Sequence, residues 1–141
     1  MEKGSVLKGT IAFLGTAVTW LFGTWDVALG VLVLFMVLDQ ITGVMRAKVN
    51  KQLNSSIGAK GIFKKMSILI VLIVAVALDR LLNKDIWVFR TLICYFYIAN
   101  EGLSLLENCA SMGLPIYDKL RDALTQLKQG GKKEVKKNNK I

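Results

Sequence analysis

The stretch MSILIVLIVAVAL, which covers Met66–Leu78, decides the fold of this chain. Apart from Ser67 it is apolar at every position, so no polar stripe repeats at the helical period. A helix that is apolar all round belongs in the core of a large protein or in a membrane. Because 141 residues make only one domain, the stretch predicts a membrane-spanning helix.

Three further apolar stretches of similar length accompany it. A span needs about 20 mostly apolar residues to cross a hydrocarbon core about 30 Å thick. The four stretches cover residues 6–25, 27–45, 62–82 and 86–108, and 53% of the chain is apolar. We therefore predict an all-α membrane protein with a bundle of four transmembrane helices in residues 1–112.

The first stretch is open to more than one interpretation. An apolar run that follows Lys3 and Lys8 resembles a cleaved signal peptide. The same run also fits a helix that lies at the membrane interface. We expect a true span. Small residues repeat at four-residue intervals along it, which lets two helix backbones approach closely. These small residues either contact another subunit or pack against the second stretch, and both roles remain open. They are Ala12, Gly15, Thr16 and Thr19.

The character of the chain changes after the fourth stretch. Gly113-Leu114-Pro115 breaks the helix, because proline disfavours helical geometry in the residue before it. Apolar residues then recur at helical spacing among charged ones. We predict a cytoplasmic amphipathic helix in residues 113–128, lying on the inner membrane surface, and a basic disordered tail in residues 129–141.

The positive charge is concentrated in two segments. The chain has a net charge of +9, and residues 46–65 hold six basic groups and no acidic one. A second basic segment covers residues 118–141. Lys and Arg near span ends stay in the cytoplasm, so we expect the 46–61 loop and both termini on that side. The basic segments favour contact with anionic lipid over binding of nucleic acid.

Several ionisable residues interrupt the apolar stretches. Each costs on the order of 3 kcal/mol in mid-membrane, so it normally faces a partner helix or water. Counting along the helices places Asp39 and Glu101 both about 10 Å inside the inner boundary. We predict an inner polar layer and, near the outer boundary, an Asp79–Arg90 pair. The residues of the inner layer are Asp39, Thr42, Lys64, Lys65, Glu101, Ser104 and Asn108.

Two interpretations of this layer remain open. Its ion pairs either hold one bundle together or line water once several chains assemble, since both arrangements turn carboxylates away from lipid. Catalysis is poorly supported, because the chain has no His and no Gly-rich phosphate loop, and no base lies beside either Cys. We expect no enzyme activity, no cofactor and no metal site.

Two blocks of residues carry a family resemblance. The first is Asp39-x-x-Thr42-Gly43-x-x-x-Ala47, followed by Asn54-Ser55-Ser56-x-Gly58-x-x-Gly61-x-x-x-Lys65. The second is Tyr97-x-x-x-Glu101-x-x-Ser104-x-x-Glu107-Asn108, followed by Gly113-Leu114-Pro115. In order and spacing these blocks resemble the toxin-secretion/phage-lysis holin family. The resemblance implies a homo-oligomer in the host bacterial cytoplasmic membrane that forms timed lesions, through which endolysin or a toxin leaves the cell.

Two other functions are compatible with the residues. A small ion channel or transporter would use Asp39 and Glu101 as permeation residues. A non-conducting membrane adaptor would recruit a cytoplasmic partner through its basic loop and C-terminal helix. Under the holin hypothesis, Asp39 and Glu101 are the residues expected to matter most for the switch from a harmless bundle to a lesion.

Overall fold

All the regular secondary structure in the described part of the chain is helical. The computed structural model describes residues 2–83 and 86–138, and no strand occurs among them. The helices are α1 (Glu2–Phe22), α2 (Val27–Val49), α3 (Ser55–Leu78), the π-helical turn η1 (Asp79–Asn83), α4 (Val88–Ser111) and α5 (Asp118–Asn138). The all-α fold predicted from the apolar stretches is confirmed at this level.

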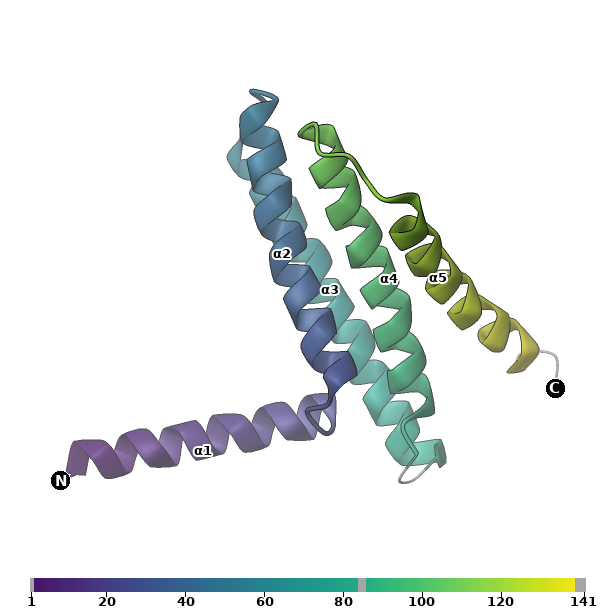
Figure 1. Ribbon diagram of the computed structural model, residues 1–141. Coiled ribbons are helices and arrows are strands. Elements are labelled where there is room, and N and C mark those ends of the chain that lie inside the picture. The colour runs from purple at the N-terminus through teal and green to yellow at the C-terminus, as the bar shows by residue number, and fades with distance from the viewer. Residues whose placement is uncertain (1, 84–85, 139–141) are drawn as a thin grey trace.

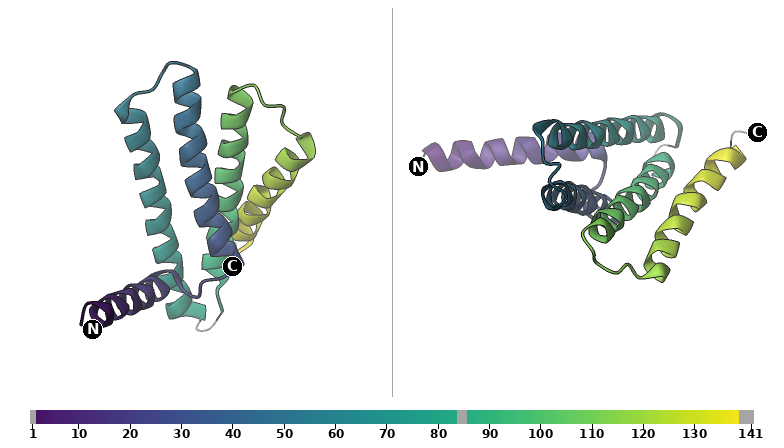
Figure 2. Two further views of the ribbon diagram at one scale, coloured as in Figure 1. Left: turned by 60° about the vertical axis from the view of Figure 1, so that its left-hand side comes forward. Right: turned by 90° about the horizontal axis from the view of Figure 1, so that it is seen from above.

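Helices α2, α3 and α4 lie side by side as an up-and-down bundle (Figures 1 and 2). Helix α1 crosses one end of this bundle at a steep angle, against the end of α3 (Figure 1). Helix α5 folds back along α4. We call the end that carries the α2–α3 turn the inner end and the opposite one the outer end, after the topology expected from the basic residues.

The bundle has a continuous apolar core and an apolar outer surface. The core cluster consists of Leu29, Leu32, Met36, Ile68, Leu72, Cys94 and Ile98. Large apolar side chains also cover the outside of α2 and α3, among them Leu34, Val37, Ile41, Ile70 and Val74. Such a surface is suited to lipid and would be unusual on a monomeric soluble protein.

The four predicted spans are supported only in part. Three helices within the described residues are long and apolar enough to cross a membrane: Lys3–Phe22, Val27–Val49 and Ser55–Leu82. Helix α4 is not among them, and it carries Arg90, Glu101 and Glu107 along its length. A total of four membrane crossings therefore stays a prediction.

The helix boundaries differ from the expected ones mainly at the inner end. Helix α2 continues to Val49 and α3 already begins at Ser55, so the turn between them is much shorter than the expected 46–61 loop. The side chain of Asn54 accepts a hydrogen bond from Ser56 N at 2.6 Å, which caps the first turn of α3. Lys51, which lies in the α2–α3 turn, has a left-handed φ of 54°.

The C-terminal segment is helical over more residues than expected. Helix α5 runs to Asn138, so the structure has residues 129–138 of the expected tail as helix, and residues 139–141 lie outside the described part. The helix lies against α4 and not across the inner end of the bundle (Figure 1).

Candidate functional site

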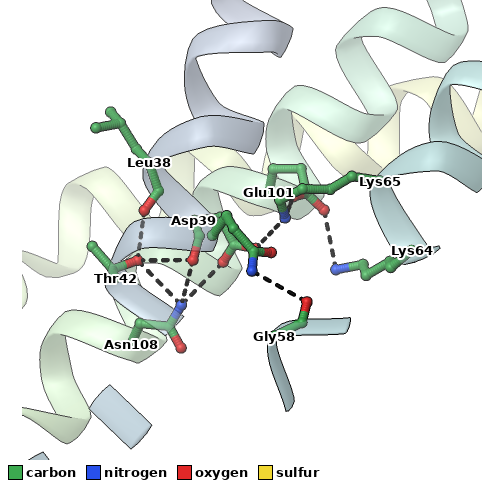
Figure 3. A network of polar contacts seen from close by, with 9 residues as sticks. Leu38, Asp39, Thr42, Gly58, Lys64, Lys65, Glu101 and Asn108 are labelled. Atoms are coloured by element: carbon green, nitrogen blue, oxygen red, sulfur yellow. Dashed lines mark hydrogen bonds and ion pairs between the residues drawn. The ribbon is translucent and has the colours of Figure 1, made fainter. Parts of the chain in front are cut away.

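A network of charged side chains joins three helices near the inner end of the bundle (Figure 3). Lys65 Nζ on α3 donates hydrogen bonds to Asp39 Oδ2 on α2 at 2.7 Å and to Glu101 Oε2 on α4 at 2.8 Å. All three side chains are buried. Asp39 and Glu101 are therefore linked through Lys65 across the interior of the bundle.

Lys64 adds the fourth charge. Its Nζ lies 3.0 Å from Glu101 Oε1, without the geometry of a hydrogen bond. The Lys64 side chain is 47% exposed, whereas Glu101 is fully buried. Two lysines thus balance two carboxylates, and the network as a whole is neutral. Its weakest contact is the one to Lys64.

The rest of the expected polar layer surrounds Asp39. Asn108 Nδ2 on α4 donates to Asp39 Oδ1 at 3.0 Å and to Thr42 Oγ1 at 3.2 Å. Ser104 lines a hollow of about 180 Å³ together with Asp39 and Asn108. The structure thus brings all seven residues of the predicted layer to one end of the bundle.

Sequence reasoning missed Gln40 in this region. Gln40 Nε2 donates to the carbonyl oxygen of Gly58 at 3.4 Å, and Gln40 lines the same hollow as Asp39. This bond links α2 to the first turns of α3. The signal was present in the sequence, because Gln40 is a second polar residue beside Asp39 in an apolar stretch.

A second cluster, centred on Arg90, ties the outer end together. The guanidinium of Arg90 is completely buried and donates to Asp26 Oδ2 at 2.7 Å, to Phe22 O at 2.7 Å and to Thr24 O at 2.6 Å. The α1–α2 turn is therefore fastened to the start of α4. Asp26 also caps α2 by accepting a hydrogen bond from Leu29 N at 2.9 Å.

The expected side-chain pair between Asp79 and Arg90 is replaced by a main-chain contact. Asp79 accepts hydrogen bonds from the backbone N–H groups of Val88, Phe89 and Arg90, the last at 2.8 Å. These groups have no partners inside their own helix, and the negative charge suits a helix N-terminus. Asp79 thus caps α4, while the guanidinium of Arg90 turns to Asp26.

Gly23 provides the first test of the outer cluster. Its φ is +77°, and an added Cβ would lie 3.1 Å from Arg90 Nε. We expect Gly23→Ala to lower the free energy of unfolding by about 1–2 kcal/mol, because a side chain disfavours this left-handed geometry. Thermal unfolding in detergent measures the effect. Gly9→Ala is the control, since nothing lies within 4 Å of its added Cβ, and equal stability of the two variants would contradict the expectation.

The Asp26–Arg90 pair predicts a pH dependence. The hydrogen bond from Arg90 holds the pKa of Asp26, which lies in the turn outside the spans, below its usual value of 3.8. The pair therefore stabilises the fold above pH 3.8, and this contribution is lost as the pH falls below that value. We expect the melting temperature of the natural chain to drop over this range.

The matched variant Asp26→Asn should show a smaller fall in melting temperature over this range, because it has no Asp26 carboxylate to protonate. Asp118→Asn, at the exposed start of α5, should show the same fall as the natural chain. The effect is modest because the Asp26 side chain is 44% exposed. Superimposable pH profiles for the natural chain and Asp26→Asn would exclude a stabilising role for the pair.

The small residues of the first stretch lie on the exposed surface of α1. Thr16 and Thr19 bond to carbonyl groups of their own helix, and an added Cβ on Gly15 would meet nothing within 4 Å. Ala12, Gly15, Thr16 and Thr19 line an open hollow with Trp20 and Arg80. Packing of α1 along α2, one of the two expected arrangements, does not occur in the structure, because α1 crosses the end of the bundle.

Both clusters place opposite charges side by side and hold helices together. Within the described residues, no three His, Cys, Asp or Glu side chains come close enough to hold a metal ion. Cys94 is buried and Cys109 is partly buried, and both are free thiols. The inner network is a set of paired opposite charges that links three helices.

Known proteins show what the chain is similar to. A model of the bacteriophage holin family matches residues 16–129. An uncharacterised protein of Clostridium perfringens is 56% identical over 121 residues, 86% of this chain and 92% of that protein. A probable holin of Bacillus phage phi105 is 34% identical over 112 residues, 79% of this chain and 82% of the phage protein. No solved structure matches the chain.

The family match covers the whole α2–α4 bundle and reaches into α5, so it includes both polar clusters. It agrees with the apolar helices in placing the protein in a membrane. The chain belongs to the bacteriophage holin family, a family of membrane proteins that are not enzymes.

Proposed function

We propose that this protein oligomerises in the cytoplasmic membrane of a bacterial host and forms lesions through which endolysin or a toxin leaves the cell. Host lysis follows at a set time. The observation that carries the proposal is the buried Asp39–Lys65–Glu101 network inside a bundle whose α2 and α3 surfaces are apolar. A passive anchor has no use for such a network, because ionisable residues in membrane spans are costly.

The proposed topology has four membrane crossings with both termini in the cytoplasm. The short, basic α2–α3 turn and the Lys-rich C-terminus then lie on the side that retains positive charge. Anionic lipid headgroups are the expected partners of these segments. In this topology α1 must leave its position across the outer end of the bundle to span the membrane.

The proposed mechanism uses the inner network twice. In a single protomer, the ion pairs neutralise each other and keep the helices closed. In an assembly, the same carboxylates and lysines face water, and contacts between subunits offset the loss of the internal pairs. The exposed small-residue face of α1 is the surface proposed for such contacts, because it lets two backbones approach closely.

Inducible expression in a bacterial host tests the function. Membrane potential, viability and culture turbidity are followed with and without a co-expressed cytosolic endolysin. We expect abrupt loss of potential after a delay, and lysis only in the presence of endolysin. Small selective currents without passage of folded protein would instead identify an ion channel. Continued growth with intact potential would remove the lesion model and favour an adaptor.

A further inference from the structure

A groove runs between α2 and α3 on the lipid-suited surface of the bundle. Its volume of about 350 Å³ lies in the usual range for ligand sites, and its lining is almost entirely apolar. Lys65 contributes mainly its aliphatic stem, because its Nζ is bonded to Asp39 and Glu101. The apolar walls are formed by Val33, Val37 and Ile41 on α2 and by Ile62, Met66 and Leu69 on α3.

The direction and depth of this groove match those of a lipid acyl chain. Val33 and Ile41 are about two helical turns apart, so the groove extends for about 12 Å along α2. Ile41 precedes Arg46, which marks the expected inner boundary, so the groove begins roughly 8 Å inside that boundary. From there it runs toward the middle of the membrane, as the acyl chain of an inner-leaflet lipid does.

The polar hollow of about 180 Å³ adjoins the groove on the side of the inner end. Gln40 lines both the hollow and the groove, so its side chain stands where the two meet. An added Cβ on Gly61 would clash with Gln40 Oε1. The absence of a side chain at Gly61 therefore gives Gln40 its place at this junction.

Two cationic side chains from different helices line the hollow. They are Arg46 on α2 and Lys64 on α3, and both are exposed. Arg46 has no ion pair with any other residue that the structure describes. Lys64 Nζ lies 3.0 Å from Glu101 Oε1 without donating a hydrogen bond to it. Both cations thus have N–H groups free for a further anion.

The carboxylate in the hollow is already compensated. Asp39 Oδ2 accepts a hydrogen bond from Lys65 at 2.7 Å, and Asp39 Oδ1 accepts one from Asn108 at 3.0 Å. The lining of the hollow therefore carries an excess of positive charge. A free phosphate ion would satisfy this charge but would leave the apolar groove empty. A zwitterionic lipid would fill the groove but would bring its own positive charge to the cations.

We infer that α2 and α3 hold one anionic phospholipid of the inner leaflet. Its phosphate lies in the hollow between Arg46 and Lys64, and one acyl chain lies in the groove. Lys64 reaches the phosphate by extending its flexible stem toward the membrane surface. The inference rests on the proposed function for the orientation of the inner end toward the cytoplasmic leaflet. It adds a defined lipid site beside the inner network, where the phosphate and Glu101 share Lys64.

Native mass spectrometry of the purified full chain in mild detergent tests the headgroup part of the site. Dioleoyl phosphatidylglycerol is titrated against dioleoyl phosphatidylcholine, which has the same acyl chains. We expect one phosphatidylglycerol per chain, bound at least fivefold more tightly than phosphatidylcholine. Arg46→Gln and Lys64→Gln should each weaken its binding about fivefold, the effect of one basic group beside an anionic headgroup.

Lys48→Gln and Lys60→Gln are the matched controls for charge. Each removes one exposed positive charge from the same end of the bundle, but neither residue lines the hollow or the groove. Their binding of phosphatidylglycerol should change by less than about twofold. An equal loss in these controls and in Arg46→Gln would show a diffuse attraction to basic residues and would overturn the site.

Filling the groove tests the acyl-chain part. Val37→Trp and Met66→Trp each place a large side chain in the groove and should weaken binding of phosphatidylglycerol at least tenfold. Leu34→Trp and Ile70→Trp are the controls, because both residues are exposed on the same helices outside the groove. Unchanged binding in the groove variants would overturn the inference, as would equally tight binding of glycerol phosphate, which has no acyl chain.

These outcomes are independent of lysis. Selective binding by a chain that never depolarises the host would keep the lipid site and contradict the proposed function. Equal binding of the two lipids by a chain that does depolarise the host would overturn the lipid site and leave the proposed function standing.

Discussion

Replacement of Lys65 by Met is expected to lower the free energy of unfolding by about 3–5 kcal/mol, because it leaves buried carboxylate charge without its main partner. Among the residues that the structure describes, Lys65 Nζ is the one group bonded to both Asp39 and Glu101. Met has a similar length and fills the same space, so the effect reports on charge and not on a cavity. Denaturation of the purified protein in detergent, followed by circular dichroism, measures it.

Lys60→Met is the matched control, since Lys60 lies on the same helix and is exposed. It should change the free energy of unfolding by less than about 0.5 kcal/mol. A second variant, Lys65→Met with Glu101→Gln, removes one positive and one negative charge and should recover part of the loss. If Lys65→Met and the Lys60→Met control have the same free energy of unfolding, the inner network does not stabilise the bundle.

The inner network was accessible from the sequence for a simple geometric reason. Helices rise by a fixed distance per residue, and apolar stretches of similar length must lie roughly parallel in a membrane. Counting from the ends of the stretches therefore places Asp39, Glu101 and Lys65 at one level. The structure has these residues in contact. What counting does not give is the rotation of each helix, which decides that Lys65 and not Lys64 lies between the two carboxylates.

The outer cluster was not accessible in the same way. Depth alone places Asp79 near Arg90, and the two residues do meet, but through the backbone N–H of Arg90. The guanidinium is taken by Asp26 because the turn after α1 folds over the end of α4, with Gly23 in a left-handed conformation. A turn of this kind depends on main-chain geometry that hydropathy does not encode.

The direction of α1 and the extent of α5 show a second limit. Length and composition qualify α1 as a span, yet the same properties fit a helix across the outer end, where the structure has it. For α5, the Lys- and Asn-rich composition of residues 129–141 predicted disorder, whereas the helix that starts at Asp118 continues to Asn138. In both segments the composition is compatible with two states, and the surroundings decide between them.

Neutralisation of the inner carboxylates is expected to make lysis earlier. Glu101→Gln and Asp39→Asn each weaken a charge-assisted hydrogen bond of Lys65, which is worth about 1.5–3 kcal/mol. If these bonds keep the protomer closed, that loss shifts the closed-to-open equilibrium by about 10- to 150-fold. The delay before loss of membrane potential should therefore shorten in both variants, and cross-linked oligomers should appear sooner. Time-resolved turbidity and membrane potential in cells with endolysin measure the delay.

Glu107→Gln is the control for this experiment, because it removes a carboxylate from the exposed side of the same helix. Its delay should equal that of the natural chain. The two substitutions in the network differ in one respect that sharpens the test. Glu101 is held by Lys64 as well as Lys65, whereas Asp39 keeps its bond from Asn108 when its charge is removed. Glu101→Gln should therefore have the larger effect, and unchanged lysis timing and oligomer size in both variants would mean that the network plays no part in the switch.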